Sequence, residues 1–201
     1  MTTIEIISIA AAAAAAGAIN AVAGGGTLVT FPVLLFFGTP PVVANATSTL
    51  ALVIGTAGSI FGYRKHIAEV KQWLNRFVPV SLAGGLIGGI LLTRTSNETF
   101  AKMVPFLILF ATILFFAQGA FSRFAGLSED QEPKHHAVFG AICFQFAVSI
   151  YGGYFGAGIG ILMLASLGFI GLTNIHEMNG LKTVLGSLIN VVAPFGLSLP
   201  A

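Results

Sequence analysis

The chain has 201 residues, of which 56% are hydrophobic and only 8% are charged. Soluble domains carry charge on about 25% of their residues, so this composition excludes a soluble fold, which could not cover so much apolar surface. The formal net charge of +2 is small, and a single cysteine excludes an intrachain disulfide. We therefore expect an all-α polytopic integral membrane protein whose main partner is the lipid bilayer.

Six apolar runs match the length of a membrane span, because about 20 predominantly apolar residues cross the hydrocarbon core of a bilayer. Eight of the nine lysine and arginine residues lie between these runs or at their ends. In chain order the runs cover residues 4–23, 42–62, 77–93, 103–120, 137–155 and 177–197.

The first run has a second interpretation, since a cleaved signal peptide is also apolar and ends in small residues. No basic residue precedes this run, and Glu5 stands where a signal peptide carries positive charge. The sequence therefore favours a retained first helix, although alanine drives membrane insertion only weakly.

Basic residues mark two of the connections between the runs. Arg64, Lys65, Lys71 and Arg76 flank the connection after the second long run, and Arg123 and Lys134 lie in the connection at 121–136. Cytoplasmic loops carry an excess of lysine and arginine, so we expect both connections to face the cytoplasm. Two predicted spans separate them, which makes the two assignments consistent.

Two segments interrupt the apolar pattern in the same way. Residues 24–48, GGGTLVTFPVLLFFGTPPVVANATS, align with a second segment when the chain is shifted by 134 residues, placing Gly24 on Gly158 and Asn45 on Asn179. Each segment holds a glycine cluster, a short apolar run, a polar break and an asparagine before a long helix. The apolar runs at 27–38 and 159–171 are too short to cross a core of about 30 Å. We predict two sequence repeats, each with a glycine-rich broken or re-entrant helix segment.

This repeat divides the chain into two membrane units. The first repeat covers residues 1–134 and ends in the cytoplasmic loop at about 121–136, and the second, incomplete repeat covers 135–201. Counterparts of the spans at 77–93 and 103–120 are missing from the second repeat, so we expect a C-terminally truncated version of a longer protein. The charges leave parallel and inverted repeats equally open.

The broken segments predict a binding site. Non-helical backbone at membrane depth is tolerated only where it is buried in protein or lines a wet cavity. Glycines let backbone amides approach a ligand, and a helix N-terminus favours an anion. The alternative is that the glycines only permit close helix packing, for which Gly152, Gly156 and Gly160 have a typical spacing.

Neutral donors and one lysine follow the glycines. Lys182 lies inside an apolar run, and an ionisable residue there is a functional candidate unless it reaches the membrane surface or pairs with Glu177. His176 and Glu177 suit either a proton relay or a helix cap, and the neutral donors suit capping or helix packing as well as binding. The candidate substrate-binding residues are Gly24, Gly25, Gly26, Asn45, Thr47, Ser48, Thr49, Gly158, Gly160, Asn179, Lys182 and Thr183.

Other motifs are missing from the sequence. No phosphate-binding loop, metal-ligand spacing or catalytic triad can be assembled. We therefore expect no cofactor, no metal, no nucleic-acid partner and no enzymatic activity.

Segment 24–48, followed by a long helix and the residues YRKH, closely resembles the N-terminal signature of the TauE/SafE sulfite exporter family of bacterial membrane permeases. Residues 152–183 resemble the second repeat of that family. The resemblance implies a multi-pass secondary transporter for small anions in the bacterial inner membrane, with sulfite, sulfonates and sulfoacetate-like compounds as named substrates. It leaves the coupling ion, the direction of transport and a possible homo-oligomer open. The alternative is a non-transporting membrane scaffold or assembly subunit.

Overall fold

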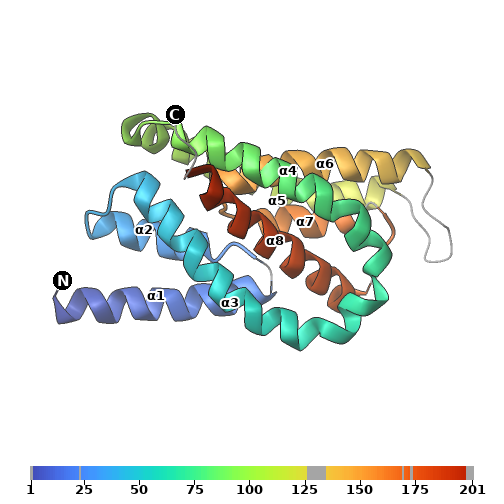
Figure 1. The fold of residues 1–201 in the computed structure, drawn as a ribbon, viewed down its shortest axis with the longest axis horizontal. Helices are drawn as coiled ribbons and strands as arrows, with labels where there is room; N and C mark the ends of the chain where they lie inside the picture. Colours follow the sequence, from blue (N-terminus) through green and yellow to red (C-terminus); the bar gives the residue numbers. More distant parts are fainter. Residues whose placement is uncertain (1, 23, 126–134, 169, 173, 198–201) are drawn as a thin grey trace.

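A computed structural model describes the chain apart from residues 1, 23, 126–134, 169, 173 and 198–201. The described residues form eight helices and no strand (Figure 1). The predicted loop at 121–136 lies largely outside the described residues. In chain order the helices are α1 (Thr3–Val22), α2 (Thr27–Phe36), α3 (Pro41–Glu69), α4 (Lys71–Thr93), α5 (Asn97–Ala125), α6 (His135–Tyr154), α7 (Ile159–Gly168) and α8 (Ile175–Leu197).

Helix α1 begins at a capping box. The backbone N–H of Glu5 donates to the Thr2 hydroxyl at 3.3 Å, and the Glu5 carboxylate accepts from the Thr2 N–H at 2.9 Å. Two of the amides that lack a partner at a helix start are thereby satisfied. The glutamate that precedes the first apolar run thus has a local structural role.

Three of the described helices, α1, α3 and α4, are long and apolar enough to cross a membrane. Pro41 occupies the first position of α3, where its missing N–H is not needed. With 29 residues, α3 is about 43 Å long, so it exceeds a hydrocarbon core of about 30 Å. The membrane protein expected from composition is therefore supported by helices of the right length.

Helices α2 and α7 confirm the prediction of two short apolar segments. Each has 10 residues, which corresponds to about 15 Å. Each is followed by a glycine with a left-handed backbone, Gly38 and Gly171, both with φ of 80°. A glycine in this conformation is a common helix stop.

Helix α4 packs between α6 and α8 through a row of glycines (Figure 1). A Cβ built on Gly88 would overlap the Ile150 carbonyl, and one built on Gly89 would overlap the Ala193 carbonyl. Small residues at helix contacts are typical of membrane proteins, where close backbone packing replaces the hydrophobic effect. This contact links the N-terminal and C-terminal halves of the chain.

Helices α3 and α8 run antiparallel to each other. Gly180, in the second turn of α8, packs against Tyr63 and Ile67 near the end of α3. The His176 ring at the start of α8 stacks on His66 of α3, with ring centroids 5.3 Å apart. The end of α3 therefore lies beside the beginning of α8.

Candidate functional site

The two glycine turns, at 24–26 and 156–158, meet inside the molecule. Gly24 has a φ of 83°, and a Cβ built on it would come within 2.5 Å of the Gly160 Cα. Gly25 faces Gly158, whose Cα would lie 3.7 Å from a Cβ at Gly25. All of these glycines are buried. The two broken segments thus converge, and part of the glycine content serves close packing between them.

A cavity of about 30 Å³ lies where the turns meet, between α1, α3, α7 and α8. A space of this size holds about two water molecules. Among the predicted site residues, Gly24, Gly160, Lys182 and Thr183 line it. The other lining residues are Asn20, Leu52, Thr56, Ser59, Gly156, Ile159, Gly186 and Asn190.

Among the described residues that line this cavity, Lys182 alone is charged, and its exposed fraction is 4%. Its Nζ donates to the carbonyls of Asn20 and Val22, at 3.4 and 3.3 Å. These carbonyls belong to the last turn of α1, which carries a partial negative charge, and the Asn20 carbonyl also accepts the Gly24 N–H at 3.2 Å. The lysine is thus buried against the end of α1, and Glu177 instead accepts a hydrogen bond from Asn174 at 2.8 Å.

Asn45 contacts the end of α6 rather than the Lys182 cavity. Its Nδ2 donates to the Tyr154 carbonyl at 3.1 Å, and its Oδ1 is buried with no hydrogen-bond partner among the described residues. Asn45 and Thr49 line a separate cavity of about 10 Å³ with Gly153 and Ala193. The first broken segment therefore contributes to two separate cavities, of which the larger lies between the two glycine turns.

The remaining predicted residues lie elsewhere. Thr47 is exposed, and with the buried Ser48 it lines an apolar cavity between α1, α2 and α3. Gly26 packs against the Ala16 carbonyl. Asn179 is buried one turn before Lys182, and its Oδ1 has no partner among the described residues.

Sequence reasoning overlooked Asn20, Thr56, Ser59 and Asn190. Asn20 and Asn190 are single amides in otherwise apolar runs, and such polar residues inside a span are a usable signal. Thr56 and Ser59 are three residues apart, so they share one face of α3. Their position on the cavity depends on which face of α3 meets α8, which a single sequence does not reveal.

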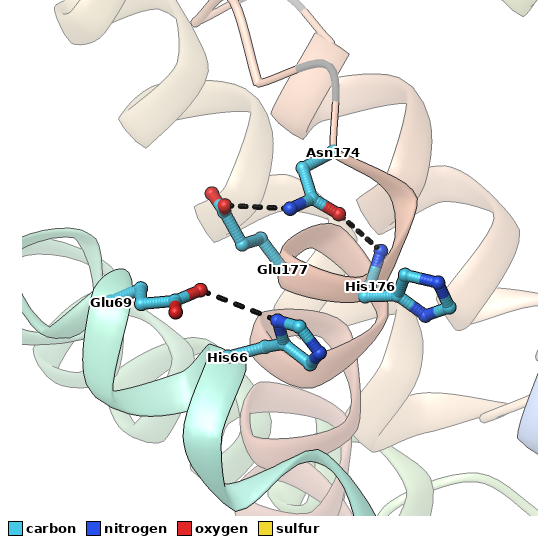
Figure 2. A network of polar contacts seen from close by, with 5 residues as sticks. All are labelled: His66, Glu69, Asn174, His176 and Glu177. Atoms are coloured by element: carbon cyan, nitrogen blue, oxygen red, sulfur yellow. Dashed lines mark hydrogen bonds and ion pairs between the residues drawn. The ribbon is translucent and has the colours of Figure 1, made fainter.

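A second polar cluster lies at the end of the contact between α3 and α8 (Figure 2). His66 Nδ1 is 3.3 Å from Glu69 Oε2, and the His66 ring stacks on His176. Asn174 Oδ1 accepts the His176 backbone N–H at 3.0 Å, and Asn174 Nδ2 donates to Glu177. Asn174 therefore caps α8, and His176 and Glu177 take part in this cap.

The described residues thus define a helical membrane protein with a buried lysine at the contact between two glycine turns. The sequence profile described as Sulfite exporter TauE/SafE matches residues 9–199. The chain therefore belongs to the sulfite exporter TauE/SafE family, as the motifs at 24–48 and 152–183 indicate. No solved structure gives a significant match to this chain.

Curated relatives of the chain carry the names of membrane transporters. A probable membrane transporter protein of Haemophilus influenzae is 32% identical over 146 residues, covering 72% of this chain and 55% of the relative. The probable membrane transporter protein ORF9 of a Sinorhizobium species is 27% identical over 77% of this chain and 56% of its own length. YfcA of Escherichia coli K12, also named a probable membrane transporter protein, is 25% identical over 89% of this chain and 63% of its own length. The chain spans little more than half the length of these relatives.

Proposed function

We propose that this protein is a multi-pass secondary transporter for small anions, such as sulfite or sulfonates, in the bacterial inner membrane. The observation that carries the proposal is the buried Lys182 in the cavity where the two glycine turns meet. A buried cation without a carboxylate partner attracts an anion, because desolvation leaves its charge uncompensated. The transporter names of the relatives support the same class of function.

The cavity offers an oxyanion several hydrogen-bond donors. Thr183 lies beside Lys182 on α8, and Ser59 faces them from α3, whereas the Thr56 hydroxyl already donates to the Val53 carbonyl at 2.8 Å. Ile159, the first residue of α7, also lines the cavity, so the positive end of that helix points toward it. No carboxylate is among the described lining residues. This combination favours a small anion over a cation or a neutral solute.

Substrate entry requires the cavity to widen, since sulfite is larger than the two water molecules that fit. Helix α1 is the element best suited to move, because only 11% of its most apolar stretch of 18 residues is buried within the protein. Its last turn is held by the two long hydrogen bonds from Lys182. An anion that competes for the ammonium group would release this end of α1.

The contact between α3 and α8 favours inverted over parallel repeats. Under the shift of 134 residues, Leu52 corresponds to Gly186 and Thr56 to Asn190, and all four line the same cavity. Corresponding helices that run antiparallel are related by a two-fold axis in the membrane plane. We infer that the repeats, 1–134 and 135–201, surround a shared central site beside the short helices α2 and α7.

Transport into proteoliposomes tests the proposal. Labelled sulfite and a small sulfonate are offered under imposed pH, Na⁺ and electrical gradients, and flux is compared with protein-free liposomes. We expect flux of at least one of these anions. No flux under any gradient would contradict the transporter, and a scaffold would then be favoured if cysteines introduced at positions 45 and 179 were both protected from thiol reagents.

A further inference from the structure

The two repeats place a positive charge at only one of two corresponding positions. Under the shift of 134 residues, Lys182 corresponds to Ser48, and Asn20 corresponds to Tyr154. At the end of α1, the Lys182 ammonium contacts the carbonyls of Asn20 and Val22. At the end of α6, no charged side chain is among the described residues that line the cavity next to Tyr154. The end of α6 thus carries the same partial negative charge without a fixed cation.

One buried oxygen atom without a donor lies at the end of α6. Asn45 Nδ2 donates to the Tyr154 carbonyl, which directs Oδ1 away from that bond and leaves it unpaired. Asn45 is 2% exposed, so this oxygen is shielded from bulk solvent. A Cβ built on Gly156 would lie 3.2 Å from the Thr49 Oγ1, which places this hydroxyl at the glycine turn that follows α6.

The cavity beside these oxygens has about 10 Å³, room for about one water-sized particle. Neutral amide, hydroxyl and carbonyl oxygens suit a monovalent alkali cation, whereas divalent cations prefer carboxylates. Transporters with discontinuous helices coordinate coupling cations at such helix ends.

We propose that the end of α6, together with Asn45 and Thr49, binds an alkali cation, with Na⁺ as the natural candidate. The bound cation plays the part at α6 that the Lys182 ammonium plays at α1. A role for this cation in driving anion transport rests on the proposed function, whereas its binding at this site does not. Occupation of this site would tie α3 to α6, as Lys182 ties α8 to α1.

Cation binding can be measured without transport. Labelled Na⁺ is dialysed against the purified protein in choline gluconate, so that no transported anion is present. The test variant is Thr49→Val, which keeps the side-chain shape and removes one oxygen. The matched control is Thr47→Val on the same helix, because Thr47 is exposed and lies outside this cavity. Thermal unfolding checks that both variants are folded.

We expect saturable Na⁺ binding by the unaltered protein and by Thr47→Val, with about tenfold or greater weakening in Thr49→Val, as expected for a lost ligand. Absence of Na⁺ binding in the unaltered protein, as for a cavity that holds water alone, would overturn the site. Equal binding in Thr49→Val would overturn it as well. Na⁺ binding without anion flux would contradict the proposed transporter but not the cation site. Anion flux without Na⁺ binding would overturn the cation site but not the proposed transporter.

Discussion

Helices α1 and α6 both end in a buried glycine turn that leads into a helix of 10 residues, but different groups hold their last carbonyls. At α1 the donor is the ammonium of Lys182. At α6 the donor is the neutral amide of Asn45, and the Tyr151 hydroxyl donates to the Ala157 carbonyl in the turn. The same backbone arrangement is therefore combined with a fixed charge in one place and with neutral groups in the other.

Under the proposed function, this difference gives two similar helix breaks two tasks. At the charged end, an anion would compete with the last carbonyls of α1 for the lysine. A neutral end with an unpaired oxygen at Asn45 suits a different ligand. Helix α1 has few buried residues, whereas α6 is packed against α4 and α7, so the charged end is also the one with more freedom to move.

The largest effect is expected at the contact between the two turns. Gly24→Ala should destabilise the protein by at least about 2 kcal/mol, because φ of 83° disfavours a side chain and the new methyl group would overlap Gly160. The control is Gly17→Ala in α1, where a Cβ meets nothing within 4 Å and helix propensity predicts a gain of about 0.5–1 kcal/mol. Thermal unfolding in detergent measures both. Similar stability of the two variants would mean that the turns do not touch.

A smaller loss of stability is expected from Asn45→Ala. This variant removes the hydrogen bond to Tyr154 and leaves a buried carbonyl without its donor, which costs about 1–3 kcal/mol. Thr47→Ala, two residues along the same helix, removes an exposed hydroxyl and should leave the melting temperature unchanged. If Thr47→Ala were the more damaging of the two, the orientation of α3 described above would be wrong.

The smallest of the stability effects is expected at the second turn. Tyr151→Phe removes the bond of 2.9 Å from the hydroxyl to the Ala157 carbonyl while keeping the ring, so a loss of about 1 kcal/mol is expected. Residue 17 occupies the corresponding position at the first turn and is a glycine without this bond. Hydrogen exchange should rise at residues 156–158 in the variant and remain unchanged at 24–26. Equal changes in both turns would show that the hydroxyl does not act locally.

Several features of the fold could be predicted from the sequence because they depend on local chemistry. Glycine clusters beside short apolar runs predicted both helix breaks, and the apolar composition predicted a membrane protein. Lys182 stood out because an ammonium is unusual inside an apolar run. Which residues share a cavity could not be predicted, since that depends on helix rotation. Thr47 and Ser48 differ by about 100° around α3, and only the packing of α1, α2 and α8 decides that Ser48 is buried and Thr47 exposed.

The unknown packing of the helices also explains why two asparagines were not predicted as cavity residues. Asn20 and Asn190 lie far apart in sequence and reach one cavity only because α1 and α8 approach each other at the first turn. Asn45 was expected near the lysine but faces α6 instead. Pairing of distant helices thus determines which candidates become neighbours, and a single sequence carries little information about it.

The binding of labelled sulfite to the purified protein tests the central claim most directly. Lys182→Gln should weaken binding by about 10- to 100-fold, the loss expected when a charge-assisted hydrogen bond of about 1.5–3 kcal/mol is removed. Lys65→Gln, at an exposed lysine on α3, is the control and should bind as the unaltered protein does. Unchanged affinity in a folded Lys182→Gln variant would contradict an anion site at this lysine.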